Sequence, residues 1–254
     1  MSQEILSKLN ASLIDEISSS RNEPDWLKDY RKSSLSVYDS LPIELSPLYN
    51  KYTDAKKMDP EKVSLSTATA ETIPSFLTKR LGELENEICI IQIGTNIVKI
   101  NLPNDLKSKG LVISSLSDAI ENNSELVKKA LEASKSDEDK FTALNNAAFN
   151  SGIFIHIPRN LIVEKPIHFF TCLSEDGHST ISRNVIFADE SSKASIVQEL
   201  YSPNIQTQQA YLELMNTSLG ANAQLDVTTL QMIDQHAVAF STRRTDLAQD
   251  SKVN

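Results

Sequence analysis

Three short segments in the C-terminal part of the chain share one pattern of residue types, and this repeat constrains the fold more than any other feature. Each segment has a small or apolar first residue, a polar turn that ends in Ser or Ala, and then a long polar and an apolar residue. Aligning Ser192, Ala223 and Ser251 gives spacings of 31 and 28 residues. Repeats of roughly 20–50 residues are typical of solenoids, in which each coil packs only on its neighbours. The three segments are 188–194, 219–225 and 247–253.

A small residue in each turn lets one coil stack closely on the next, while alternate side chains of the flanking strands fill a central core. We therefore expect apolar positions to correspond between coils. The expected correspondence is between Val185, Phe187, Ile196 and Val197 of one coil and Leu212, Leu214, Leu225 and Val227 of the next. The alternative is that the three segments are ordinary turns of a β-sandwich or barrel, and the repeat alone leaves that alternative open.

The chain before residue 152 has a different pattern. Apolar residues spaced three and four apart predict helices within 5–17, 23–41, 71–84, 116–134 and 141–149, and 42–70 is expected to be mostly loop. Two β-branched runs, 88–93 and 97–102, flank a short turn with Gly94 and predict a hairpin, and 111–113 predicts a third strand. For the last helix we expect Ser136 and Asp137 to act as N-caps and Gly152 to end it.

These patterns predict an α+β fold with two parts. Residues 1–151 form an N-terminal helical and mixed α/β region, and residues 152–254 form the first coils of a right-handed β-helix, a stacked β-solenoid. The third repeat reaches Val253 without a polar terminal coil, and solenoids need such caps to cover their strand edges. We therefore expect the solenoid to be incomplete at its C-terminus.

Composition argues against several classes of partner. The net charge of −9 opposes binding to nucleic acid and to anionic membranes. No apolar stretch approaches the roughly 20 residues that span a bilayer, and the first residues lack the features of a secretion signal. The two cysteines, Cys89 and Cys172, have no CxxC partner, which fits a reducing compartment. We expect a cytoplasmic protein that binds neither nucleic acid nor membrane.

His168 and Cys172 are the pair that most invites a metal site. They are four residues apart on one predicted strand, so at roughly 3.3 Å per residue they stand about 13 Å apart, too far to share an ion. Cys89 lies inside an apolar strand and is expected to be a small buried residue. His156 alternates with isoleucines and is expected to face solvent or to hydrogen-bond a neighbouring coil.

The remaining polar motifs are interpreted as turns or as surface. The stretch 175–178 and the segment with Asp234 and His236 are predicted to be turns. If 243–244 lies in a strand, Arg243 and Arg244 are expected to point to opposite faces. No nucleotide-binding or nucleophile motif occurs. We therefore predict no catalytic and no metal-binding residue, and the cofactor-binding residues stay unknown.

Several motifs, taken in order, resemble the SufB/SufD family of iron–sulfur cluster assembly proteins. The stretch 141–158 resembles the helix, glycine, strand and proline that lead into the family's core, and 163–168 resembles its strand that ends in Pro-Ile. The segments 219–231 and 243–251 resemble two successive rungs. Near the N-terminus, 23–31 is similar to the family's first helix, and the short path from 41–42 to 51–54 looks more like SufD than SufB.

The resemblance implies a non-catalytic, SufD-like scaffold subunit of an iron–sulfur cluster assembly complex. In that family a SufB-type and a SufD-type subunit pair through their β-helices, so a hetero- or homodimer is expected, and both recruit a SufC-type ABC ATPase through a C-terminal helical region. The family's metal and sulfur ligands are expected beyond Asn254, so no ligand residue is assigned. This fragment is therefore expected to bind no cofactor and to fail alone in ATPase binding and cluster assembly, although an iron–sulfur cluster is implied for the intact complex. The alternatives are a generic β-solenoid interaction module and, less well supported, a polysaccharide-active β-helix enzyme.

Overall fold

The structure is a computed structural model that describes residues 5–43, 58–65, 73–174 and 178–254. The predicted motifs at 51–54 and 175–177, and most of the predicted loop 42–70, lie outside the described residues. The helices are α1 (Ala11–Ser20), α2 (Asp25–Ser40), the 3₁₀ turn η2 (Pro60–Lys62), α4 (Ser75–Glu83), α5 (Asn104–Ser108), α6 (Leu116–Asn122), α7 (Ser124–Ala133) and α8 (Lys140–Ala148). The strands are β1 (Ile88–Ile93), β2 (Asn96–Asn101), β3 (Val112–Ser115), β4 (Ile153–Ile157), β5 (Ile167–Cys172), β6 (Thr180–Ala188), β7 (Lys193–Tyr201), β8 (Gln209–Leu219), β9 (Gln224–Met232), β10 (Ala237–Leu247) and β11 (Lys252–Val253).

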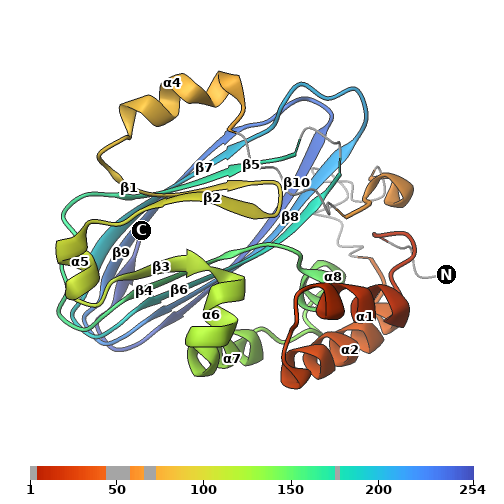
Figure 1. Ribbon diagram of the computed structural model, residues 1–254. Coiled ribbons are helices and arrows are strands. Elements are labelled where there is room, and N and C mark those ends of the chain that lie inside the picture. Colours follow the sequence, from red (N-terminus) through yellow and green to blue (C-terminus); the bar gives the residue numbers. More distant parts are fainter. Residues whose placement is uncertain (1–4, 44–57, 66–72, 175–177) are drawn as a thin grey trace.

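The strands from β4 onward alternate between two facing sheets. Within the described residues one sheet has the order β11-β9-β7-β5-β1-β2 and the other β10-β8-β6-β4-β3. From β4 onward each strand therefore pairs with the strand two places along the chain. All pairs among β4 to β11 are parallel. Figure 1 shows the result, a stack of coils with helices around it. The α+β class and the β-solenoid are therefore confirmed, and the sandwich or barrel alternative is wrong.

The repeat in the sequence lies at one corner of each coil. Asn160, Ser191, Asn222 and Asp250 all have positive φ angles, between 58° and 62°. Backbone N–H groups join successive corners, from Asn160 to the Glu190 carbonyl (3.0 Å) and from Asn222 to the Gln249 carbonyl (2.9 Å). The residue after each positive φ is the aligned small residue in three corners, and Ser192 and Ala223 are buried. The fourth corner has Leu161 at that place, which explains why the pattern of small residues missed it.

The expected correspondence of apolar residues between coils is wrong in detail. Leu212 stacks on Ile181 and Leu214 on Arg183, four residues from the positions expected. In the other sheet Leu225 stacks on Ala194 and Val227 on Ile196, one or two residues from the expected partners. The prediction assumes that an apolar residue of one coil always stacks on an apolar residue of the next. In the structure several register positions pair an apolar residue with a polar one, such as Leu214 with Arg183.

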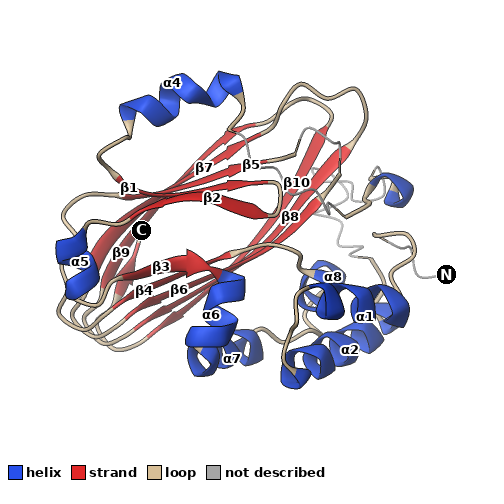
Figure 2. Cartoon of the chain, viewed as in Figure 1, coloured by secondary structure: helices blue, strands red, loops and turns tan. Residues whose placement is uncertain are grey.

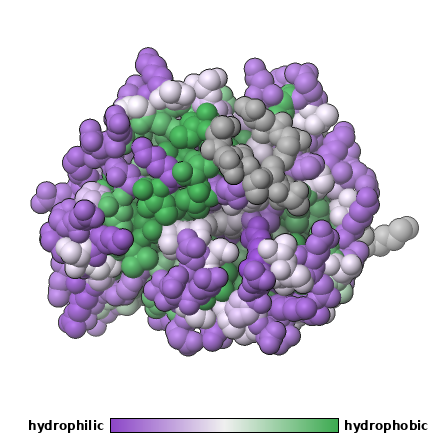
Figure 3. Space-filling model, in the orientation of Figure 1, coloured by the Kyte–Doolittle hydropathy of each residue, from purple (hydrophilic) through white to green (hydrophobic). Residues whose placement is uncertain are grey.

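The strands before residue 152 join the same two sheets. The predicted hairpin is present as β1 and β2, and β1 also pairs in parallel with β5. The predicted third strand is β3, which pairs antiparallel with β4 and so extends the opposite sheet. Helix α5 lies on the connection between β2 and β3, as Figure 2 shows. Figure 3 shows apolar residues on the face that carries the hairpin, where Ile100 is 41% exposed.

Helices α7 and α8 pack on the outer face of the sheet formed by β6 and β8, and α1 and α2 pack on α8. Arg183 on β6 joins α7 and α8 to the sheet. Its buried guanidinium donates to Ser134 Oγ (3.0 Å), to the Ala130 carbonyl (3.3 Å) and to Asn146 Oδ1. Burial lowers the pKa of Arg183 to about 10. None of the described helices is long and apolar enough to cross a membrane.

The predicted helix boundaries need two corrections. Asp139, not Ser136 or Asp137, caps α8 by accepting from the Thr142 N–H at 2.9 Å. Gly152 does not end α8, whose C-cap is Phe149. Gly152 has φ +153° and lies against β6, where a Cβ atom would stand 1.8 Å from the Arg183 carbonyl oxygen. The glycine is needed for this close approach of two backbones. The predicted helix at 116–134 is divided into α6 and α7 at Asn123.

Replacing Gly152 by alanine should therefore lower the free energy of unfolding by about 3 kcal/mol or more, because a methyl group cannot fit without moving a buried backbone. Urea unfolding monitored by circular dichroism measures it. Gly82→Ala is the matched control, since nothing lies within 4 Å of a Cβ at that helical position. That variant should be neutral or stabilised by up to about 1 kcal/mol. Equal stability of the two variants would contradict the close approach.

Candidate functional site

The space between the two sheets is apolar near the corners and polar in the middle. Ile155, Ile186, Ile196 and Met215 belong to the apolar cluster near the corners. Farther along the strands, Glu213 on β8 points into the same space and is only 5% exposed. A carboxylate in this position needs hydrogen-bond donors, because burying one without them is costly.

Four neutral donors surround the Glu213 carboxylate. Asn184 Nδ2 and Ser241 Oγ each donate at 2.6 Å, Gln198 Nε2 donates at 2.5 Å, and Tyr211 OH donates at 3.2 Å. Burial, and then the charge of Glu213, raises the pKa of Tyr211 well above its usual value, so this phenol stays a donor. The donors come from β6, β7, β8 and β10, so the cluster joins both sheets.

Arg243 on β10 adds a cation to this cluster. Its guanidinium donates to Gln198 Oε1 (2.8 Å) and to Thr229 Oγ1. Gln198 therefore connects a cation and a carboxylate that do not touch each other. We call Glu213, Asn184, Gln198, Tyr211, Ser241, Thr229 and Arg243 the inner cluster.

A second ionisable cluster lies on the outer face of the β5–β7 sheet, beneath α4. Glu199 on β7 has a fully buried side chain. Arg80 on α4 donates two hydrogen bonds to its carboxylate, from Nε to Oε2 at 3.1 Å and from Nη2 to Oε1 at 2.7 Å. Tyr201 OH donates to it at 2.7 Å. His168 Nδ1 lies 3.6 Å from Glu199 Oε1, which is too long for a hydrogen bond. We call these four residues the outer cluster.

Burial by itself raises the pKa of Glu199, but the surrounding donors, His168, Arg80 and Tyr201, outweigh it and lower the pKa to about 2. Given the long distance to His168, we assign the lowering chiefly to Arg80 and Tyr201. The same contacts act in reverse on Tyr201, whose pKa is raised by burial and by the Glu199 charge. Glu199 is therefore a permanent anion at neutral pH, neutralised by a cation from another element.

The structure places His168 and Cys172 on one face of β5, under α4. His168 is next to Glu199, whereas Cys172 is buried in an apolar cluster that also holds Cys89. In the described part of the chain, no group of three His, Cys, Asp or Glu side chains is arranged to hold a metal ion.

The other polar residues singled out in the sequence lie apart from one another. His156 Nε2 is 2.8 Å from Asp189 Oδ2, at the corner of the next coil. His236 Nδ1 is 2.8 Å from Asp234 Oδ1 within one turn. Arg243 points inward, and Arg244 points outward to Glu138 between α7 and α8.

Two models of known protein families match most of the chain. The model described as "SufBD protein N-terminal region" matches residues 81–169, and the model described as "SUF system FeS cluster assembly, SufBD core domain" matches residues 170–254. The two matches are contiguous and in order. The chain belongs to the SufBD family. The core-domain match contains Glu199 and Glu213.

Curated SufBD relatives align along nearly the whole chain. An iron-sulfur cluster assembly SufBD family protein of Staphylococcus aureus (strain USA300) is 25% identical over 248 residues, which cover 93% of this chain and 53% of that protein. An iron-sulfur cluster assembly SufBD family protein of Staphylococcus saprophyticus is 23% identical over 253 residues, with the same coverage. The chain thus spans about half the length of the curated relatives it matches.

Sequence reasoning missed the central residues of both clusters of this SufBD chain. Glu199 and Glu213 each stand inside a strand with apolar residues nearby. An ionisable residue at the middle of such a strand is a signal, because charged side chains are almost never buried without partners. Their partners come from other coils and from α4, and no local pattern brings those residues together.

The outer cluster predicts a pH dependence of stability. The folded-state pKa of Glu199 is about 2 against an ordinary value of 4.5, so its stabilisation is complete above pH 4.5 and is lost as pH falls toward 2. Glu199→Gln should therefore remove about 1–3 kcal/mol at pH 6, after allowance for the partial exposure of Arg80, and little at pH 2. Urea unfolding across this pH range measures the difference.

Glu125→Gln is the matched control, because that side chain is 87% exposed. Its pH profile should run parallel to that of the unmodified chain. An E199Q profile that also runs parallel would contradict the assigned role of Arg80 and Tyr201.

Proposed function

We propose that this protein is a non-catalytic, SufD-like scaffold subunit of an iron–sulfur cluster assembly complex. The observation that carries the proposal is the contiguous match of two SufBD family models across residues 81–254, the region that includes both stacked sheets. The curated relatives of Staphylococcus are named as iron-sulfur cluster assembly proteins, and the function is carried over from them. In this proposal the iron–sulfur cluster is the product of the complex, and the described part of the chain holds no resident cofactor.

The chemistry of the two clusters supports a structural role. Every oxygen of Glu213 and Glu199 accepts hydrogen bonds from residues of the protein itself. A carboxylate that serves as an acid or base needs an open position for its substrate. Both carboxylates are instead committed to holding strands and α4 in place.

The polysaccharide-enzyme alternative is poorly supported by the same geometry. Glycosidases place two carboxylates opposite each other across a substrate groove. Here Glu213 points between the sheets, whereas Glu199 points to the outer face beneath α4. The two buried carboxylates therefore do not face a common groove.

The proposed partners are a SufB-type subunit and a SufC-type ABC ATPase, with dimer formation through the β-helix, in the cytoplasm. These partners come from the family resemblance, as does the preference for SufD over SufB. The second hypothesis is a generic interaction module built on the same solenoid. The two hypotheses differ only in the partners that they predict for the protein.

The test uses the protein tagged at its native locus in the source organism. We expect a SufB-type subunit and a SufC-type ATPase to co-purify with it. Deletion of the gene should lower aconitase activity, which depends on an iron–sulfur cluster, and re-expression of the gene should restore it. Purification without either partner, together with unchanged aconitase activity in the deletion strain, would reject the cluster-assembly role and favour a generic interaction module.

A further inference from the structure

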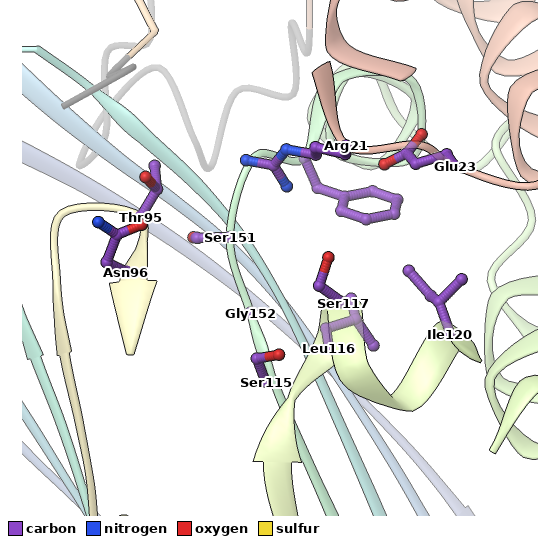
Figure 4. A pocket seen from close by; sticks show the side chains of 11 residues that line it. Arg21, Glu23, Thr95, Asn96, Ser115, Leu116, Ser117, Ile120, Ser151 and Gly152 are labelled. Atoms are coloured by element: carbon purple, nitrogen blue, oxygen red, sulfur yellow. The ribbon is translucent and has the colours of Figure 1, made fainter. Parts of the chain in front are cut away.

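A small pocket lies where the helical region meets the first coil. Its volume is about 260 Å³. Its wall includes Arg21 and Glu23, the polar side chains of Thr95, Asn96, Ser117 and Ser151, and the apolar side chains of Leu116, Ile120 and Phe149. The charged and polar residues come from the α1–α2 connection, the β1–β2 turn, the first turn of α6 and the residue pair before β4 (Figure 4). Hydroxyl and amide groups thus lie beside a guanidinium, together with one carboxylate and three apolar side chains.

The guanidinium of Arg21 has no carboxylate of its own. The nearby Glu23 binds Arg31 in a bidentate pair, Nε to Oε2 and Nη2 to Oε1, both at 2.7 Å, and also accepts from Ser18. Among the described residues, Arg21 donates one hydrogen bond, to the Asn150 carbonyl, and forms no ion pair. Figure 4 shows the guanidinium extending away from Glu23, toward Ser151 and the hairpin turn.

Arg21 therefore keeps guanidinium donors that no carboxylate of the described residues occupies. The one carboxylate in the pocket wall, that of Glu23, is held by Arg31, and Glu16 and Glu61 lie with Lys8 in the adjoining cavity. Burial, and then the charge of Arg31, lowers the pKa of Arg21 to about 10, and Glu23 offsets only part of this effect. A partly desolvated guanidinium with unused N–H donors is suited to bind an oxyanion, because its donors match the geometry of phosphate and carboxylate oxygens.

We propose that this pocket is an oxyanion-binding site, in which Arg21 holds a phosphate group and the surrounding hydroxyl and amide groups complete its coordination. The site is independent of the proposed role in cluster assembly, and either can fail without the other.

The adjoining cavity indicates what can carry the phosphate. This second cavity has a volume of about 610 Å³ and shares Arg21, Thr95 and Asn96 with the first. Its other charged residues are Lys8, Glu16 and Glu61. Two glutamates disfavour a second phosphate there, so the site suits either free phosphate or the monophosphate of a small organic molecule.

Isothermal titration with inorganic phosphate and with glycerol 3-phosphate, at constant ionic strength set with KCl, tests the proposal. The unmodified chain should bind phosphate, and thermal melting should show stabilisation by phosphate beyond that by KCl. Tighter binding of glycerol 3-phosphate supports an organic phosphate that uses the adjoining cavity, and equal binding supports free phosphate.

Two variants locate the site. Arg21→Gln removes the cation and should weaken binding at least about tenfold, the value of one charge-assisted hydrogen bond. Asn96→Asp is nearly isosteric but adds a negative charge to the wall, and it should weaken binding to a similar degree. Arg159→Gln is the matched control, because that arginine is exposed and paired with Glu190 on a distant corner. It should bind as the unmodified chain does.

Circular dichroism confirms that each variant is folded, and Asn96→Asp keeps the test decisive if Arg21→Gln does not fold. The absence of phosphate binding by the unmodified chain at millimolar concentrations would overturn the proposal. Undiminished binding by a folded Arg21→Gln or Asn96→Asp variant would overturn it as well.

Discussion

The corners of the solenoid impose the constraint on which the rest of the structure depends. Four residues 28 to 31 positions apart, Asn160, Ser191, Asn222 and Asp250, adopt the same left-handed conformation. Each corner hydrogen-bonds to the next through the backbone, so the coils rise together and their strands pair in parallel. Asparagine, aspartate and serine suit these positions because short polar side chains tolerate that conformation better than branched ones. The close stacking of coils also determines which residue type fits at position 220. At Gly220 a Cβ would stand 2.5 Å from the Glu190 nitrogen of the coil below.

Stacking in one register also determines where charge can be buried. Because successive side chains of a strand point to opposite faces, neighbours in sequence serve different layers. Gln198 belongs to the inner cluster, whereas Glu199 belongs to the outer cluster and is held by Arg80 of α4. A slip of β8 by two residues would keep Glu213 in the interior but separate it from its three donors on β6, β7 and β10, at a large cost in free energy. The buried polar residues therefore favour one arrangement of coils over its neighbours, a role that suits a protein built to present fixed surfaces.

The sequence predicts the architecture of the fold but not the residues of the inner and outer clusters. Apolar periodicity located most helices, the β1–β2 hairpin and the strand nature of the C-terminal part, because these depend on local spacing. The repeat revealed three corners through their small residues and missed the one with Leu161. The sequence predicts that Gly152 ends a helix, whereas the glycine is needed for a contact with Arg183, which is 31 positions away and invisible to local patterns. The same applies to Glu199 and Arg80, 119 residues apart, and to the pocket at Arg21, whose wall comes from four separate segments.

The register of the coils is tested most directly by cross-linking between matched positions of β7 and β9. Lys193 and Gln224 are both exposed and are register partners, so cysteines at these positions should be bridged rapidly by a short thiol-specific reagent such as dibromobimane. Cysteines at Lys193 and Thr228 lie four residues out of register, about 13 Å along the strand, and should not be bridged. Single-cysteine variants correct for reaction at Cys89 and Cys172. Efficient bridging of the first pair alone is the result expected of stacked parallel coils. Bridging of the second pair, or of neither, would contradict the stacking on which this description of the molecule depends.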